Sequence, residues 1–219
     1  DLVRSRGLGD VYKRQILQGE TEVALRSSSV GEEIRSVLVS NLEELEHLSR
    51  LVNDMLTLAE AEAGNQVLSR ETINLKPIVE DLVEQVRLLA AERNIQIECG
   101  VLSDAYIHGD ELWIRRAILN LLDNAIKYSK DRGPIRVWTN ADSATVRLGV
   151  RDNGIGISSA DLPHIFDRLY RADPVRNRSS GGAGLGLPLV KWIVEAHQGK
   201  IDVVSEIDKG TSFEISFPR

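Results

Sequence analysis

Three polar side chains recur in the sequence at the spacing of a helix. Asn120, Asn124 and Lys127 are separated by four and three residues, so a helix would carry two amides and an ammonium on one face. An amide oxygen can ligate Mg²⁺, and an ammonium can contact phosphate oxygens, which suits phosphoryl transfer. Asparagines on a helix are more often simply solvated, so this cluster does not establish a site on its own.

A carboxylate followed by glycines stands directly after a predicted strand. Val146, Leu148 and Val150 alternate with other residues, and the sequence DNGIG comes next at residues 152–156. A carboxylate at a strand end can accept a hydrogen bond from an amino group, and glycines let the backbone approach a flat base. The alternative is an ordinary turn with a capping aspartate.

Two further clusters are FDRLYR at residues 166–171 and GGAGLGL at residues 181–187. Glycine-rich backbone that opens a helix offers free N–H groups and the positive end of the helix dipole to phosphates. A dinucleotide fingerprint would need a third glycine where Leu187 stands, and a P-loop would need Gly-Lys-Ser/Thr, which the sequence lacks. Both of these glycine motifs are therefore excluded.

The elements that must position these clusters predict a mixed fold. The pattern predicts helices over Pro77 to Glu92, Asp110 to Ser129 with Asp110 as N-cap, and Leu185 to His197. The predicted strands are Glu71 to Leu75, Ile95 to Glu98, Ile135 to Thr139, Thr145 to Arg151, Lys200 to Ser205 and Thr211 to Phe217. Without strict alternation of strands and helices, they favour an α+β sandwich of two layers, with helices on one sheet face.

The two predicted hairpins turn at Asn140 to Asp142 and at Asp208 to Gly210. Between Arg171 and Gly184 the sequence is polar and without apolar periodicity, which is typical of a loop that serves as a lid.

A separate helical region precedes this domain. From Glu32 to Glu62 apolar residues recur every three or four positions, which predicts a bundle or coiled-coil helix. Gly64 and Asn65 are expected to end it. Residues 16–26 are compatible with the end of an antiparallel partner helix, so we expect a partial helical hairpin over 16–64 and a second domain over 65–219.

Composition limits the classes of partner. The net charge of −6 argues against nucleic acid or an anionic lipid surface as the partner. One cysteine cannot form an internal disulfide, which fits a reducing compartment such as the cytoplasm. No apolar run reaches the roughly 18 residues that cross a bilayer.

In their order along the chain, NLLDNAIKY, DNGIG, FDRLYR, GGAGLGL and the late Gly210-Thr211 resemble the N, G1, F, G2 and G3 boxes of sensor histidine kinases. These kinases belong to a wider ATPase class that includes Hsp90, gyrase and MutL. The resemblance covers about residues 71–219 and the preceding helix. It implies the Bergerat ATP-binding fold, with ATP and Mg²⁺ as cofactors.

The resemblance also implies a role for each matching residue. Asn124 would ligate Mg²⁺ with support from Asn120, while Asp152 would bind the adenine amino group. Asn120, Lys127 and Arg171 would be the catalytic side chains. The ATP-binding residues implied are Asn120, Asn124, Lys127, Tyr128, Asp152, Gly154, Gly156, Ile157, Phe166, Arg171, Gly182, Gly184, Leu185, Gly186 and Thr211.

Members of the class that hydrolyse ATP carry a glutamate one helical turn before the metal-binding asparagine. This chain has Asn120 at that position. Without a general base there, hydrolysis should be slow and the γ-phosphate remains for another acceptor.

The resemblance implies a phosphoacceptor histidine on the first bundle helix. Residues 16–26 resemble the family's sequence just after that histidine, and counting back about eleven residues from Gly19 reaches Leu8. Residues 1–15 match neither the helical pattern nor the family, so we expect them to be foreign or divergent. The chain's own histidines, which are His47, His108, His164 and His197, are expected to be structural.

The resemblance implies further partners. These are a response-regulator receiver domain and, in a parent kinase of the bacterial inner membrane, a second copy bound through the dimerisation helices. Two alternatives stay open at this point. One is a non-enzymatic module whose interactions are gated by a nucleotide, and the other is a chaperone or topoisomerase ATPase.

Overall fold

The computed structural model describes residues 31–64, 66–130, 133–172 and 184–219. The chain divides into two compact units, Asp1–Ala59 and Glu60–Arg219. The division falls within helix α2 (Glu32–Glu62), slightly before the boundary predicted at residue 64. In the described part of the chain, no helix is long and apolar enough to cross a membrane. The predicted partner helix at 16–26 and the position of Leu8 lie outside the described residues.

Helix α2 has the bounds that its apolar periodicity predicts. Gly64 follows it with a left-handed φ of 68°, and its N–H donates to the Ala61 carbonyl at 3.1 Å. Several residues of the apolar stripe are exposed, among them Ile34 at 60% and Met55 at 51%. A helix with an exposed apolar stripe is suited to pairing with another helix.

Five strands form the central sheet of the second unit, in the order β2-β4-β5-β7-β6. Their bounds are β2 Ile97–Leu102, β4 Ile135–Ala141, β5 Thr145–Arg151, β6 Lys200–Glu206 and β7 Gly210–Pro218. Strands β2 and β4 pair in parallel, and the other neighbours are antiparallel. Both predicted hairpins, β4–β5 and β6–β7, are confirmed.

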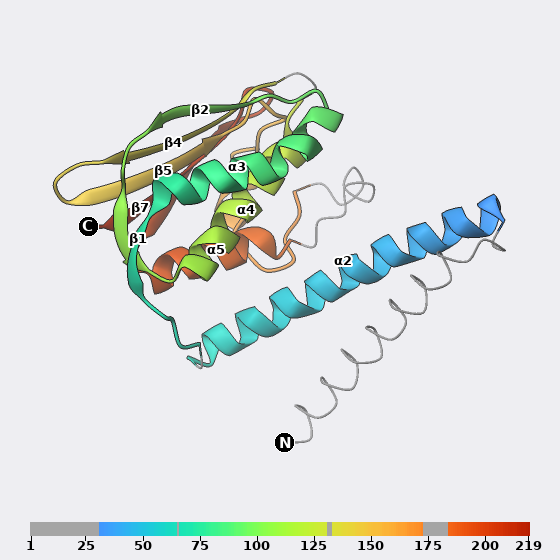
Figure 1. Ribbon diagram of the computed structural model, residues 1–219, viewed down its shortest axis with the longest axis horizontal. Helices are drawn as coiled ribbons and strands as arrows, with labels where there is room; N and C mark the ends of the chain where they lie inside the picture. The colour runs from blue at the N-terminus through green and yellow to red at the C-terminus, as the bar shows by residue number, and fades with distance from the viewer. Residues whose placement is uncertain (1–30, 65, 131–132, 173–183) are drawn as a thin grey trace. The chain divides into compact units, whose positions relative to one another are not determined.

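Three helices cover one face of this sheet (Figure 1). They are α3 (Leu75–Glu92), α4 (Glu111–Tyr128) and α5 (Gly186–Ala196). Alternate strand residues are buried, such as Val146, Leu148 and Val150. Strands β1 (Glu71–Asn74) and β3 (Tyr106–Gly109) form a separate antiparallel pair, and a 3₁₀ turn, η1, spans Leu162–His164. The two-layer sandwich is the predicted α+β fold.

Helix α3 begins at Leu75, two residues before the predicted start at Pro77. Asn74 is the N-cap, because its Oδ1 accepts from the N–H of Lys76 at 3.1 Å and from that of Ala105 at 3.1 Å. The proline stands inside the first turn, where its missing N–H has no intrahelical partner to lose. The prediction that proline opens the helix was wrong.

Three strand predictions need correction. Strand β2 starts at Ile97 rather than Ile95, because Asn94 has a left-handed φ of 55° and the Ile95 N–H donates back to Ala90. Strand β3 was missed, since it is only four residues long. Strand β4 runs to Ala141, and the turn after it is capped by Asp142, whose Oδ1 accepts from the N–H of Ala144 at 2.9 Å.

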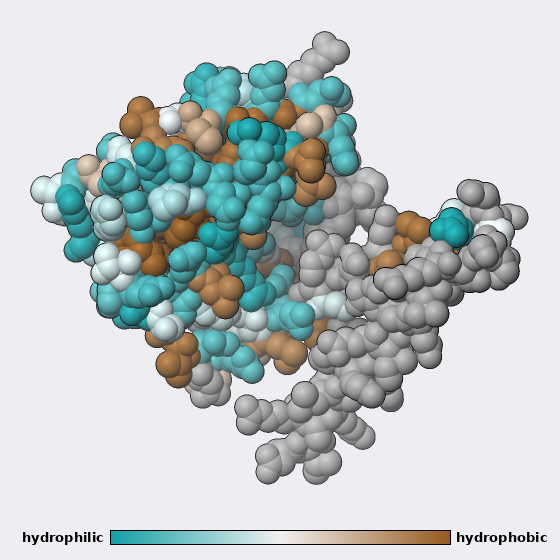
Figure 2. Space-filling model, in the orientation of Figure 1, coloured by the Kyte–Doolittle hydropathy of each residue, from teal (hydrophilic) through white to brown (hydrophobic). Residues whose placement is uncertain are grey.

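The surface of the second unit is mixed in hydropathy. Figure 2 shows apolar side chains scattered among hydrophilic ones on the face in view. Exposed apolar residues of this unit include Val67, Leu88, Val101, Leu112 and Val204. Single exposed apolar residues of this kind are normal on a soluble surface.

Candidate nucleotide-binding site

Asp152 is a buried carboxylate directly after the end of β5. Its residue is 5% exposed, and its Oδ1 accepts from the backbone N–H of Gly154 at 2.8 Å and of Thr211 at 3.2 Å. The Asp152 N–H donates to the Thr211 carbonyl at 2.9 Å. Burial raises the pKa of the Asp152 carboxyl, while the two backbone donors act to lower it. The carboxylate is therefore fixed in orientation and poorly hydrated.

The DNGIG turn is tied to the ends of two other elements. The N–H of Ile155 donates to the Tyr128 carbonyl at the end of α4, at 3.1 Å. The N–H of Asp208, in the β6–β7 turn, donates to the Ile155 carbonyl at 2.8 Å, and the Ile157 N–H donates to Ser205 Oγ at 2.8 Å. These bonds bring the N, G1 and G3 boxes together.

Glycine is required in this turn by the closeness of neighbouring backbone. A Cβ on Gly154 would stand 2.2 Å from the Tyr128 carbonyl oxygen. A Cβ on Gly156, whose φ is +69°, would stand 2.0 Å from the Glu206 carbonyl oxygen. A larger residue at either position would force the neighbouring backbone to shift, so these glycines let three protein segments meet.

The polar face of α4 is half-buried and borders the start of α5. Asn120, Asn124 and Lys127 are all partly exposed, as their spacing predicts. The Asn120 Nδ2 donates to the Arg116 carbonyl at 3.0 Å. Its Oδ1 stands 3.0 Å from where a Cβ on Gly186 would lie, so the glycine lets the first turn of α5 pass close to Asn120. The N and G2 boxes are therefore in direct contact.

The F box meets the G2 box through the backbone. The N–H of Leu169 donates to the Gly184 carbonyl at 2.9 Å. Gly184 has a φ of +70°, and a Cβ there would stand 2.6 Å from the Tyr170 carbonyl oxygen. Arg171 lies near Tyr128: burial raises the pKa of the Tyr128 hydroxyl, and the Arg171 charge acts to lower it.

Three further predicted site residues, which are Thr211, Leu185 and Phe166, lie in the described part of the chain. Thr211 is 7% exposed, and its hydroxyl pairs with Ser205 Oγ at 2.9 Å. Leu185 is buried next to the first residue of α5. The Phe166 ring centre lies 5.8 Å from Lys191 Nζ on α5, so its recorded contact is with that helix. Gly182 lies outside the described residues, as do residues 173–183 of the lid predicted between Arg171 and Gly184.

The structure adds positioning residues that the sequence did not single out. Ser205 Oγ donates to the Gly210 carbonyl at 3.0 Å and so joins the G1 and G3 boxes. Arg93 Nη1 donates to the Ile126 carbonyl at 2.6 Å and to the Lys127 carbonyl at 2.9 Å, which caps the C-terminal end of α4. Neither residue stands in a motif, and their roles depend on contacts distant in sequence.

His197 has the structural role predicted for it. It is 4% exposed, its Nδ1 donates to the Ile193 carbonyl at 2.7 Å, and its Nε2 accepts from the Asp110 N–H at 3.0 Å. Burial lowers the pKa of this imidazole, which keeps it neutral. His164 pairs with Asp167 at 2.9 Å on the surface.

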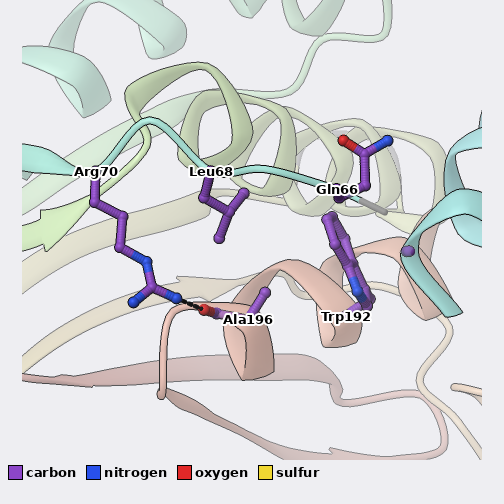
Figure 3. A pocket seen from close by; sticks show the side chains of 6 residues that line it. Gln66, Leu68, Arg70, Trp192 and Ala196 are labelled. Carbon is purple, nitrogen blue, oxygen red and sulfur yellow. Dashed lines mark hydrogen bonds between the residues drawn. The ribbon is translucent and has the colours of Figure 1, made fainter. Parts of the chain in front are cut away.

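A hollow of about 590 Å³ has a different set of lining residues (Figure 3). It is lined by Ala61, Gln66, Leu68, Arg70, Trp192 and Ala196. The Arg70 guanidinium donates to the Ala196 carbonyl at 2.7 Å. None of the predicted ATP-binding residues lines this hollow, so it is not the predicted nucleotide site.

Comparison with known proteins identifies the family. Residues 109–219 match the family described as "Histidine kinase-, DNA gyrase B-, and HSP90-like ATPase". Sensor histidine kinase CusS of Escherichia coli is 38% identical over 199 residues, which is 91% of this chain and 41% of CusS. Sensor protein IrlS of Burkholderia pseudomallei is 34% identical over 202 residues, covering 92% of this chain and 43% of IrlS. The chain thus spans about two fifths of the length of these curated relatives.

Solved structures agree with this assignment. Full-length ShkA in complex with AMPPNP has a TM-score of 0.80 at 27% identity, covering 98% of this chain and 45% of ShkA. The histidine kinase AdeS of Acinetobacter baumannii has a TM-score of 0.69 at 25% identity, covering 93% of each chain. With the family match over half of its length, the chain belongs to the histidine kinase-, DNA gyrase B- and HSP90-like ATPase family, as the catalytic domain of a sensor histidine kinase.

Proposed function

We propose that the chain binds ATP with Mg²⁺ and transfers the γ-phosphate to a histidine of a dimerisation domain. In the full-length parent, the phosphate then passes to an aspartate of a response-regulator receiver domain. The observation that carries this proposal is the meeting of five sequence-distant boxes around the Asp152 carboxylate and the polar face of α4.

The base end of the site is assigned to Asp152. Both recorded backbone donors lie on its Oδ1, so an adenine amino group would donate to the same buried carboxylate from the ligand side. Because the group is poorly hydrated, a hydrogen bond to its charge is strong. Gly154, Gly156, Ile157 and Thr211 would border the base.

The phosphate end is assigned to the polar face of α4. The described residues contain no cluster of three or more His, Cys, Asp or Glu side chains that could hold a metal. Mg²⁺ is commonly bound by few protein ligands together with substrate phosphates, so the Asn124 amide oxygen fits this donor set. When bound there, Mg²⁺ would neutralise phosphate charge. Lys127 and Arg171 would add positive charge.

Transfer is favoured over hydrolysis by the side chain at position 120. The Asn120 amide donates to the Arg116 carbonyl of its own helix and carries no basic group that could activate water. We propose that this chain cannot phosphorylate itself, because Leu8 stands at the position of the acceptor histidine. The exposed stripe of α2 supports dimerisation of the membrane-anchored parent.

The test is nucleotide affinity measured by calorimetry on the wild type and on Asp152→Asn. The asparagine keeps the shape and loses the charge, and its amide N–H₂ cannot accept from an adenine amino group. We expect ATP affinity to fall at least about tenfold, the factor that corresponds to about 1.4 kcal/mol. Asp202→Asn is the matched control, since Asp202 pairs with Lys200 on the exposed strand β6. Equal affinities for Asp152→Asn and the wild type would overturn the site.

A further inference from the structure

Ser129, directly after α4, carries a buried hydroxyl with no recorded partner. The residue is 5% exposed, and its Oγ has no hydrogen-bond partner among the residues that the structure describes. Leaving a buried hydroxyl unpaired is unfavourable, and most buried polar side chains find a partner. An unpaired group of this kind needs an explanation, and a bound ligand or water at the site is one.

The backbone of Ser129 fixes the direction of its side chain. Ser129 forms an antiparallel bridge with Gly154, in which the Ile155 N–H donates to the Tyr128 carbonyl. This is the non-hydrogen-bonded type of residue pair, in which the two side-chain directions lie on the same face and close together. The Ser129 side chain therefore lies on the face to which a Cβ on Gly154 would point.

That face carries the Asp152 carboxylate. A Cβ on Gly154 would stand 2.7 Å from Asp152 Oδ1. The neighbouring backbone groups already have partners, since the Ser129 N–H donates to the Ala125 carbonyl at 3.0 Å and the Tyr128 carbonyl accepts from Ile155. The hydroxyl is thus a spare polar group on the Asp152 side of the site.

We infer that the Ser129 hydroxyl binds the purine ring of the nucleotide beside Asp152, directly or through one water. This inference rests on the proposed function of the site. A purine presents a ring nitrogen next to its amino group, and a hydroxyl can donate to that nitrogen while the carboxylate accepts from the amino group. Ser129 and Asp152 together would form hydrogen bonds with the ring nitrogen and the adjacent amino group of the base.

The test compares Ser129→Ala with the wild type in stability and in affinity for ATP and ADP. Because the hydroxyl has no partner within the described part of the chain, its removal should leave the melting temperature unchanged or raise it. Affinity should fall about tenfold, and by the same factor for ATP and ADP, because the contact is at the base and not at the γ-phosphate. Ser143→Ala, in the exposed turn at the far end of β5, is the matched control.

A second variant separates a ligand contact from a structural role. Ser205 Oγ is bonded to three partners, so Ser205→Ala should lower the melting temperature. If Ser129→Ala behaves in the same way and keeps full affinity, its hydroxyl is structural and the inference is overturned. A loss confined to ATP would also overturn it.

Asp152→Asn distinguishes this inference from the proposed function. If Asp152→Asn loses affinity and Ser129→Ala does not, the nucleotide site stands and the role of Ser129 falls. If neither variant loses affinity, both proposals fall.

Discussion

The buried charge of Asp152 opposes folding. Burial raises the pKa of its carboxyl above the ordinary 3.8. Between the ordinary and the raised value, the folded chain holds a proton that the unfolded chain has lost. Stability therefore falls as pH rises through this window, and the ionised group is destabilising at neutral pH.

Asp152→Asn removes this charge while an amide oxygen can still accept from the backbone donors. At pH 7 the variant should be at least as stable as the wild type in chemical denaturation. Its advantage should shrink as pH falls through the raised pKa, where the wild-type carboxyl becomes neutral. A marked loss of stability at pH 7 would show that the charge itself holds the turn.

His197 has the opposite dependence on pH. Burial lowers the pKa of its imidazole below the ordinary 6.5, with Arg70 acting in the same direction while Asp110 and the Ile193 carbonyl oppose the shift. As pH falls below 6.5, the unfolded chain takes up a proton before the folded chain does, so stability is lost until the lowered pKa is reached.

His197→Gln should therefore lose less stability than the wild type when pH falls below 6.5. At neutral pH it should be less stable by about 1–3 kcal/mol, because the bond to the Asp110 N–H and the packing of the ring are disturbed. Denaturation curves at several pH values measure both effects. His108→Gln, at an exposed position of β3, is the control. Wild-type pH dependence in His197→Gln would contradict this account.

At the scale of elements, the sequence predicted the strands in which buried and exposed residues alternate and the helix whose N-cap residue stands directly before it. Strands β4 and β5 alternate buried and exposed residues, and Asp110 caps α4 as predicted, with its Oδ1 accepting from the Trp113 N–H at 3.4 Å. Strand β2 was misplaced because it is an edge strand with mostly exposed residues. Its position depends on pairing with β4, which no local pattern encodes.

The same contrast between local patterns and contacts of distant segments applies to the candidate site. Asp152 and the glycines stand in recognisable motifs, so the sequence alone could single them out as candidates. Ser129 and Ser205 could not be found in this way. Their importance comes from the bridge to Gly154 and from bonds to Ile157, which form only when distant elements meet.

Gly210 tests whether the close approach of elements holds the site together. Its φ is +92°, and a Cβ there would stand 2.1 Å from the Asp152 carbonyl oxygen. Gly64 also has a positive φ, of +68°, but a Cβ there would meet nothing within 4 Å. Alanine variants at these two glycines therefore separate the cost of left-handed backbone from the cost of a steric clash.

Gly64→Ala should cost about 1 kcal/mol, the usual penalty for an alanine in left-handed backbone. Gly210→Ala should cost at least about 3 kcal/mol, since the β7 start must move away from Asp152. Chemical denaturation measures the free energy of unfolding of both. Equal losses would mean that the contact at Gly210 is easily relieved.

At the scale of the molecule, the chain combines an ATP-binding domain with helix α2. The curated relatives are more than twice as long as this chain. Two of its histidines have structural contacts: His197 is buried and bonded, and His164 pairs with Asp167. We propose that the catalytic domain acts on a phosphoacceptor that another domain supplies.

Incubation with γ-labelled ATP and Mg²⁺ tests this central claim most directly. The chain should be assayed alone and together with a histidine-bearing dimerisation domain of a sensor kinase, with Asp152→Asn as the control of weakened ATP affinity. We predict acid-labile label on the added domain alone, and less of it when Asp152→Asn replaces the wild type at an ATP concentration below saturation. Acid-labile label on this chain when it is incubated alone would contradict the account.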